Sequence, residues 1–144
     1  MVAAKKFGAD FVFHGNEDIT SCLREVNQGR LADLVIICTG ALNVFKTALQ
    51  SVDRAGTVLF FAPTDPGVEL SVPVNDFWRN GIKLMPSYAN SPQDAIQAIE
   101  IIETKYLPVS KLITHYLSLK ETGLGFRLVA DGKESIKVII NPHV

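Results

Sequence analysis

The sequence predicts an α/β fold in which a mostly parallel sheet carries helices on both faces. Strand-like and helix-like segments alternate along the chain, which is the order that builds βαβ units. Two strand-like segments, 32–38 and 57–62, are almost wholly apolar, as expected for parallel strands that are buried on both faces. The 144 residues are enough for one ordinary domain with a single core.

The first strand and helix are expected between residues 10 and 29. Asp10–Phe13, an aromatic and β-branched run, predicts a strand. Asn16 or Asp18 can cap the helix that follows, and Asn27-Gln28-Gly29 is a good signal for its end. The apolar residues of this helix share one face: Ile19, Cys22, Leu23 and Val26.

Two predicted strands flank the next helix. Thr39-Gly40 ends the strand 32–38, and the helix is expected to carry Leu42, Phe45, Leu49 and Val52 on one face and to close at Arg54-Ala55-Gly56. The strand 57–62 is stopped by Pro63. A loop is expected to hold Phe77 and Trp78, which anchor against the core or a partner rather than contact a substrate.

A strand at 81–85 and a well-marked helix come next. Ser91 as cap, Pro92 at the first helical position and Asp94 two residues later predict a helix that runs to about Tyr106. Its inward face is expected to comprise Ala95, Ile96, Ala98, Ile99 and Ile102.

The C-terminal part predicts two strands, 112–119 and 136–140, around a weak helix near 121–131. Gly123 and Gly125 each destabilise that helix by about 1 kcal/mol relative to alanine. The run Gly123-Leu124-Gly125 lacks the last glycine of a dinucleotide-binding turn and does not follow a strand at the right place, so it is not expected to bind phosphate.

Composition excludes several classes of protein. A net charge of −1, with lysine and arginine scattered along the chain, argues against binding to nucleic acid or to a membrane surface. The longest wholly apolar runs have five residues, far below the roughly 18 that a membrane helix needs. The N-terminus has no signal-peptide pattern, and Cys22 and Cys38 have no metal-binding spacing, which favours a reducing, cytoplasmic setting.

No catalytic or metal-binding set is expected in this chain. The cysteines and histidines (Cys22, Cys38, His14, His115 and His143) are dispersed, whereas zinc needs three or four convergent ligands. No Ser-His-Asp or Cys-His arrangement can be argued from the spacing.

Several segments, in order, resemble the medium-chain dehydrogenase/reductase family, which includes the zinc-type alcohol, sorbitol and threonine dehydrogenases. The segments that carry this resemblance over nearly the whole chain are 4–10, 32–40, 55–61, 87–88, 112–115 and 132–140.

The resemblance implies a partial Rossmann-like, doubly wound sheet that lacks its first βαβ unit. The G-x-G-x-x-G turn of that unit occurs nowhere in the sequence. Residues 1–144 would then form one truncated nucleotide-binding domain, in which about 108–144 correspond to the segment that returns to the catalytic domain. His115 belongs to that returning strand and is not expected to be catalytic. The family's zinc lies in the half that this chain lacks.

The resemblance also implies cofactor-binding positions at the strand ends. Cys38, Thr39 and Gly40 would lie near the adenosine of NAD or NADP. Phe61, Ala62 and Pro63 would lie toward the nicotinamide, as would Pro86, Ser87 and Tyr88. Lys137 aligns with a basic residue that can reach the pyrophosphate. Plain readings stay open: Cys38 and Phe61 as strand residues, Thr39-Gly40 and Ala62-Pro63 as turns, and Lys137 as a solvated lysine.

The loss of the first two family strands predicts exposed sheet edges. The family order 3-2-1-4-5-6 would leave Leu34–Cys38 with an open apolar edge. We therefore expect the Asp10 strand to pair beside Leu34–Cys38, or a second copy to fill the gap. In related enzymes the opposite edge, here Lys83–Ser87, pairs across a dimer, so a homo-oligomer is expected.

Three hypotheses follow for function. The first is a fragment of an NAD(P)-dependent, zinc-type alcohol or polyol dehydrogenase that is inactive alone and binds no cofactor by itself. The second is a non-catalytic oligomerisation or interaction module that keeps the sheet and has lost the site. The third is an independent α/β protein that binds a small ligand near Thr39 and Ala62.

Overall fold

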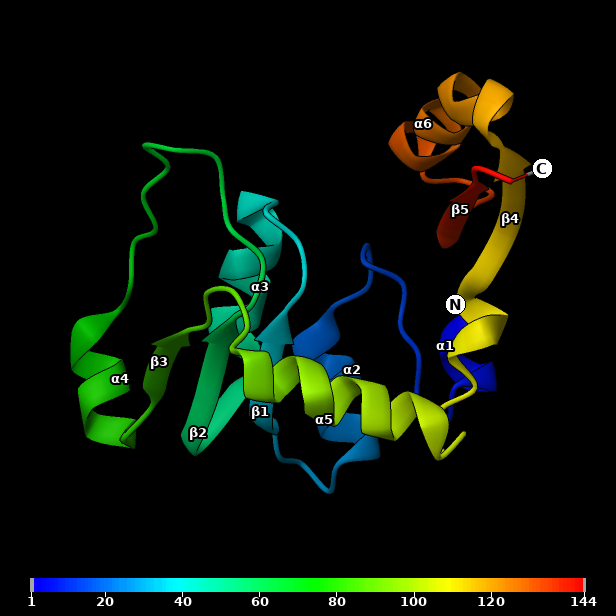
Figure 1. The fold of residues 1–144 in the computed structure, drawn as a ribbon. Coiled ribbons are helices and arrows are strands. Elements are labelled where there is room, and N and C mark those ends of the chain that lie inside the picture. The colour runs from blue at the N-terminus through cyan, green and yellow to red at the C-terminus, as the bar shows by residue number, and fades with distance from the viewer. Residues whose placement is uncertain (1, 144) are drawn as a thin grey trace. The chain divides into compact units, whose positions relative to one another are not determined.

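The computed structural model describes residues 2–143, and the chain forms two compact units, Met1–Ala89 and Asn90–Val144. The first unit contains α1 (Val2–Lys6), α2 (Ile19–Val26), β1 (Ala32–Ile37), α3 (Leu42–Ser51), β2 (Val52–Phe60), α4 (Val74–Asn80) and β3 (Lys83–Pro86). The second contains α5 (Pro92–Glu103), the 3-10 turns η1 (Val109–Leu112) and η2 (Leu119–Glu121), β4 (Ile113–Ser118), α6 (Thr122–Asp131) and β5 (Lys137–Asn141) (Figure 1).

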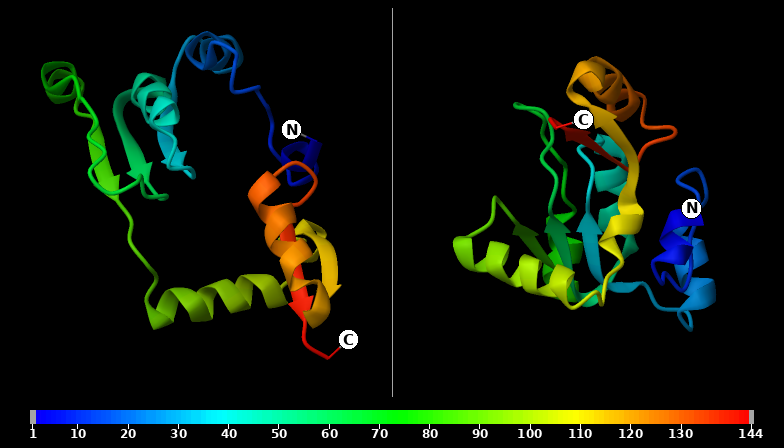
Figure 2. Two further views of the ribbon diagram at one scale, coloured as in Figure 1. Left: turned by 90° about the horizontal axis from the view of Figure 1, so that it is seen from above. Right: turned by 45° about the vertical axis from the view of Figure 1, so that its right-hand side comes forward.

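The first unit is built on a parallel sheet with the order β1-β2-β3. Ile37 pairs with Phe60, and Phe60 pairs with Pro86, so the three strands end level with one another. The helices α2, α3 and α4 lie along one face of this sheet (Figure 2). The predicted α/β class with a mostly parallel sheet is therefore confirmed.

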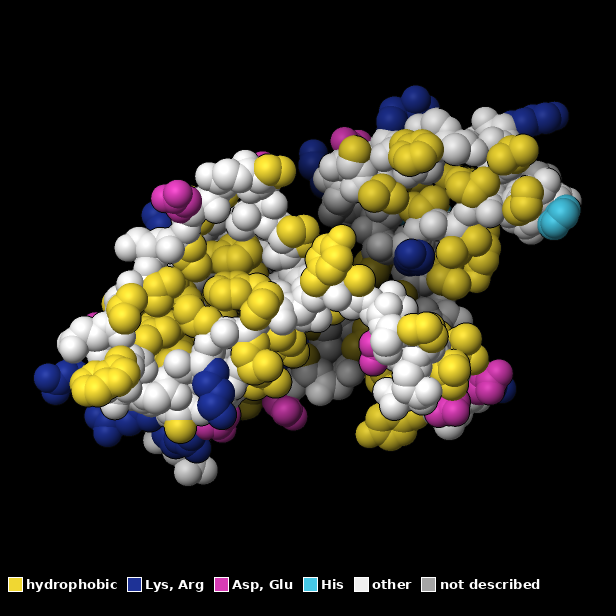
Figure 3. All heavy atoms as spheres, turned by 60° about the vertical axis from the view of Figure 1, so that its left-hand side comes forward, with side chains coloured by type: hydrophobic (Ala, Val, Ile, Leu, Met, Phe, Trp, Pro, Cys, Tyr) yellow, Lys and Arg dark blue, Asp and Glu magenta, His cyan; other side chains and the backbone are white. Residues whose placement is uncertain are grey.

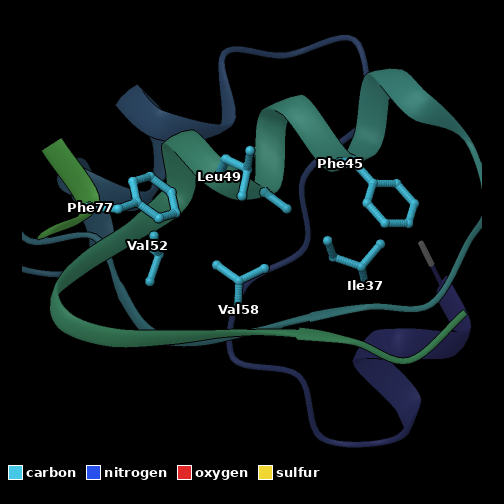
Figure 4. Packing of buried hydrophobic residues seen from close by; sticks show 7 residues of the cluster. Ile37, Phe45, Leu49, Val52, Val58 and Phe77 are labelled. Atoms are coloured by element: carbon cyan, nitrogen blue, oxygen red, sulfur yellow. The ribbon is translucent and has the colours of Figure 1, made fainter. Parts of the chain in front are cut away.

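The core of the first unit lies between the sheet and this helical layer. Apolar positions at helical spacing on α3 meet strand residues whose side chains point to the same face. Figure 4 shows the side chains of this cluster, drawn from β1, α3, β2 and α4, pointing toward one another. Its members are Ile37, Phe45, Ala48, Leu49, Val52, Val58 and Phe77, and Val58 is fully buried.

Helix α2 begins and ends as its sequence predicts. The carboxylate of Asp18 accepts hydrogen bonds from the backbone N–H and the hydroxyl of Ser21, which satisfies one of the free donors of the first turn. The helix ends at Asn27, whose N–H donates to the carbonyl of Leu23. The predicted apolar face, which includes Leu23 and Val26, is half-buried.

The expected strand at Asp10–Phe13 is wrong. These residues adopt no regular secondary structure and pair neither with β1 nor with any other described strand. A strand needs a partner for its backbone groups, and none is present here. Instead, the rings of Phe11 and Phe13 stack with centroids 6.5 Å apart, and Lys5 lies over Phe11.

The boundary between α3 and β2 lies earlier than predicted. The helix ends at Ser51, whose hydroxyl donates to the carbonyl of Thr47. Val52, predicted as a helical residue, is extended (φ −89°, ψ 137°), buried and paired with Ala32. Pairing with β1 from Val52 onward requires an irregular register between Ala32 and Leu34, which sequence periodicity does not reveal.

Helix α4 was expected to be a loop. Asp76 stands in its first turn, and Gly81 closes it in the left-handed conformation at φ 64°, both of which are ordinary signals for helix ends. Phe77 is buried in the core, as its predicted anchoring role requires, whereas Trp78 is 79% exposed.

Apolar side chains also gather on the surface of the first unit (Figure 3). β1 is an edge strand, and its Leu34 and Ile36 are 56% and 50% exposed, on the face of the sheet opposite α3. Met85 of the other edge strand, β3, is 50% exposed. The predicted open, apolar edge at β1 is present among the described residues.

The second unit contains a β4–α6–β5 arrangement in which the two strands are parallel and α6 packs on them. Both strands and the helix lie within a few residues of their predicted ranges. At the start of α5, Ser91 and Asp94 form a reciprocal capping box with Pro92 at the first position, as predicted.

The second unit does not bury the expected inward face of α5. Ile96, Ile99 and Ile102 are 48%, 55% and 48% exposed, and α5 contributes no buried residue. Helical spacing predicts that these side chains share a face, but burial also needs a second element that covers the face.

Candidate functional site

Three chain segments lie at the carboxyl end of the sheet of the first unit. The carboxyl ends of parallel strands lie together, and β1, β2 and β3 end at Ile37, Phe60 and Pro86 (Figure 1). The segments at these three ends, 38–40, 61–63 and 86–88, hold nine of the ten residues predicted to contact a cofactor. Ligands of open α/β sheets bind at this edge. We call these three segments the strand-end platform.

Backbone hydrogen bonds continue beyond the strands and hold the platform together. The carbonyl of Ile37 accepts from the N–H of Phe61 (3.2 Å) and from the N–H of Ala62 (2.9 Å). The carbonyl of Phe60 accepts from the N–H of Ser87 (2.9 Å). The segments 61–63 and 86–88 are therefore each tied to the last residue of the neighbouring strand.

Gly40 makes the closest approach within the platform. A Cβ added to it would lie 2.4 Å from the carbonyl oxygen of Pro63. Thr39 supports the same turn, because its hydroxyl accepts a hydrogen bond from the N–H of Ala41 (3.4 Å) ahead of α3.

The platform is open to solvent. Ala62 is half-buried and the other eight residues are exposed, with Phe61 at 60% and Tyr88 at 98%. Cys38 carries a free thiol. Apolar and aromatic groups exposed beside backbone polar groups can contact both the rings and the hydroxyl groups of a nucleotide.

The tenth predicted residue, Lys137, belongs to the second unit. It begins β5, is exposed, and its carbonyl accepts a hydrogen bond from the hydroxyl of Thr114 (3.2 Å).

One cavity beside the platform was not predicted. It has a volume of about 300 Å³ and is lined by Phe45, Phe60, Thr64, Val68, Leu70, Val72 and Leu84. The rings of Phe45 and Phe60 stack in one wall with centroids 5.5 Å apart. The alternation of Val68, Leu70 and Val72 in the sequence is the signal that this segment folds back onto the core.

The clearest perturbed acids have structural roles away from the platform. Hydrogen bonds from Thr20 and Ser21 lower the pKa of Asp18 to about 2. Hydrogen bonds from Ser91 and Ser118 likewise lower the pKa of Asp94 and of Glu121 at the other caps. Asp53 accepts hydrogen bonds from the N–H groups of Arg54 and Leu31, which lower its pKa.

The donor set of the described residues does not fit zinc. Within residues 2–143, no three or more His, Cys, Asp or Glu side chains converge in a way that could hold a metal ion. The glycine-rich turn that holds the phosphates of a dinucleotide in such folds is not in the sequence. None of the helices described in this range is long and apolar enough to cross a bilayer.

Solved structures share this fold. An alcohol dehydrogenase zinc-binding domain protein from Burkholderia ambifaria superimposes with a TM-score of 0.86 at 19% identity, over 97% of this chain and 38% of that one. Benzyl alcohol dehydrogenase from Acinetobacter calcoaceticus also gives a TM-score of 0.86 at 19% identity, over 96% and 39%.

Curated relatives and a family model match the sequence. Sorbitol dehydrogenase of Halalkalibacterium halodurans is 26% identical over an alignment of 144 positions that covers 96% of this chain and 40% of that protein. Erythritol/L-threitol dehydrogenase of Mycolicibacterium smegmatis is 28% identical over an alignment of 142 positions that covers 96% of this chain and 38% of that protein. The chain thus spans about 40% of the length of such relatives. Residues 2–104 match the model of the zinc-binding dehydrogenases, and the chain belongs to that family.

Proposed function

We propose that this chain is the cofactor-side part of an NAD(P)-dependent, zinc-type alcohol or polyol dehydrogenase, and that it is inactive by itself. The observation that carries this proposal is the strand-end platform, in which three exposed segments stand level at the ligand-binding edge of a parallel sheet. In this proposal residues 1–144 are a truncated nucleotide-binding domain, and about 108–144 correspond to the returning segment.

The platform residues bind and orient the cofactor. We propose that they keep a measurable affinity for it in the chain alone, although the missing phosphate-binding turn predicts none. Cys38, Thr39 and Gly40 lie toward the adenosine. The segments 61–63 and 86–88 lie toward the nicotinamide, where Phe61 and Tyr88 offer exposed rings for stacking. For Lys137 we keep the role that the family resemblance implies, a positive charge for the pyrophosphate.

The chemistry of the complete enzyme would be a hydride transfer between the nicotinamide and an alcohol carbon. This chain supplies orientation for it and neither a metal site nor a phosphate-binding turn among its described residues. Turnover therefore requires the parts that the longer relatives contain. We expect no oxidation of alcohols or polyols by the chain alone.

A second candidate is an oligomerisation module derived from this fold. It is favoured by the edge of β1, with exposed Leu34 and Ile36, and by the opposite edge, Lys83–Ser87. Exposed sheet edges recruit other chains, so a second copy is the partner that we propose for both edges. We further propose a cytoplasmic location, supported by two free cysteines without metal-binding spacing; fractionation of cells that produce the chain tests it.

Calorimetric titration with NADH and NADPH up to millimolar concentration separates the two candidates. Saturable heat supports a cofactor-binding role, whereas self-association without any heat supports the oligomerisation module. Phe61→Asp is the site variant. Phe126→Asp is its matched control, because Phe126 is an exposed phenylalanine (74%) on α6 of the second unit. If both variants bind as tightly as the parent chain, the platform is not the site.

A further inference from the structure

Gly40 has no side chain at a point where any side chain would collide with the backbone. A Cβ there would lie 2.4 Å from the carbonyl oxygen of Pro63 and 3.5 Å from its carbonyl carbon. Real Cβ atoms essentially never come within 3.0 Å of a non-bonded heavy atom, so the backbone of one of the two segments would have to move.

The conformation of Gly40 does not itself require glycine. Five glycines of the first and second units have a positive φ, among them Gly67 and Gly81, but Gly40 is not one of them. An alanine could adopt its backbone angles. The space beside it, rather than its φ, is therefore the reason for glycine at this position.

The segment 61–63, which faces Gly40, cannot move away from it freely. The N–H groups of Phe61 and Ala62 both donate to the carbonyl of Ile37, which lies three residues before Gly40. These two bonds fix the start of the 61–63 segment. At the other end, Leu70 and Val72 pack against the core. A side chain at position 40 would have to break or lengthen these bonds to gain room.

We propose that Gly40 is a positioning residue, which sets the distance between the adenosine-side segment 38–40 and the nicotinamide-side segment 61–63. This inference rests on the proposed function, in which one dinucleotide spans both segments. A displacement of more than about 0.5 Å is enough to spoil a binding geometry built on two supports. A ligand that contacts only the first segment does not depend on that distance.

Hydrogen exchange tests the spacing itself, with or without a cofactor. Gly40→Ala should speed the exchange of the Ala62 and Phe61 amides by about tenfold or more and leave the interior amides of β2 unchanged. Gly15→Ala and Gly123→Ala are the controls, because a Cβ at either position meets nothing within 4 Å. Unchanged exchange at Ala62 in Gly40→Ala overturns the proposed spacing.

Ligand affinity tests whether the spacing positions a cofactor. In the chain, Gly40→Ala should weaken NADH binding by about tenfold and AMP binding by clearly less, since AMP needs only the first segment. An equal loss for both ligands means a merely structural role and overturns the proposal, as does unchanged NADH affinity. If the parent chain binds neither ligand, the proposed cofactor role fails, and the positioning role fails with it even where the exchange result stands.

Discussion

Gly125 of α6 faces Ile140 of β5 so closely that a Cβ on the glycine would lie 3.1 Å from the Cδ1 of the isoleucine. Two further methyl groups, from Leu117 and Val138, would be 3.4 Å away. The glycine that weakens the helix in isolation is thus what allows the helix to approach both strands.

Alanine at the two glycines of α6 should therefore have different effects. Gly123→Ala should raise the free energy of unfolding by up to about 1 kcal/mol, because it improves helix propensity in open space. Gly125→Ala should raise the free energy of unfolding by less, or even lower it, because the Ile140 side chain must move to make room for the new methyl group. Urea unfolding of both variants measures the difference, and an equal gain would contradict close packing at Gly125.

Ala55 is strained, since its φ is +58° in the irregular first part of β2. Ala55→Gly should stabilise the chain by about 1 kcal/mol, because glycine adopts this conformation without a steric penalty. Ala98→Gly is the control: it lies on the exposed surface of helix α5 and should destabilise. Thermal unfolding reads both signs, and destabilisation by Ala55→Gly would argue against the positive φ.

The cap of α2 should make stability depend on acid pH. The pKa of Asp18 is about 2 in the folded chain, below its ordinary value of 3.8, because Thr20 and Ser21 donate hydrogen bonds to the ionised form. A depressed folded pKa gives stability that is present above the unfolded pKa and is lost as pH falls through the folded one.

Between about pH 4 and pH 2 the parent chain should thus lose more stability than Asp18→Asn, which can still cap the helix but does not titrate. Circular dichroism melts across this range measure it. Asp65→Asn, in the segment after β2, serves as the comparison and should follow the parent curve. Coincident curves for the parent chain and Asp18→Asn would remove the electrostatic account of this cap.

Self-association should depend on which sheet edge carries the added charge. In sedimentation velocity, Leu34→Lys/Ile36→Lys should reduce association through β1, and Met85→Lys should reduce it through β3, since charges on edge strands oppose pairing. The two variants control for each other. A parent chain that stays monomeric at high concentration would exclude both proposed contacts.

Local signals explain which parts of the fold could be predicted. The Ser91-Pro92-Gln93-Asp94 cap and the apolar run 32–38 depend on neighbouring residues, and both predictions are confirmed. Asp10–Phe13 has strand-forming residues but no partner among the described strands. Helix α5 has an apolar face that nothing in the second unit buries. Both differences arise because pairing and burial are tertiary properties.

The candidate site follows the same division. Strand ends that share an edge could be predicted from the parallel topology, and the nine residues of 38–40, 61–63 and 86–88 do stand there. Two features join residues from separate elements: the contact of Gly40 with Pro63, and the cavity lined by Phe45 and Phe60. The sequence pattern therefore predicts neither of them. The cofactor roles stay a prediction until binding is measured.

The backbone N–H groups of Phe61, Ala62 and Ser87 donate to the last residues of the neighbouring strands, β1 and β2. The chain is therefore held in place directly after β2 and at the end of β3. Inserted or deleted residues there would shift the platform. From Thr64 to Pro73, between that platform and α4, the chain crosses the surface without helix or strand. Changes of loop length are therefore best tolerated at the exposed turn 65–67, ahead of Leu70 and Val72, which pack against the core. An engineer could graft a new binding loop there, next to the site, and keep the sheet intact.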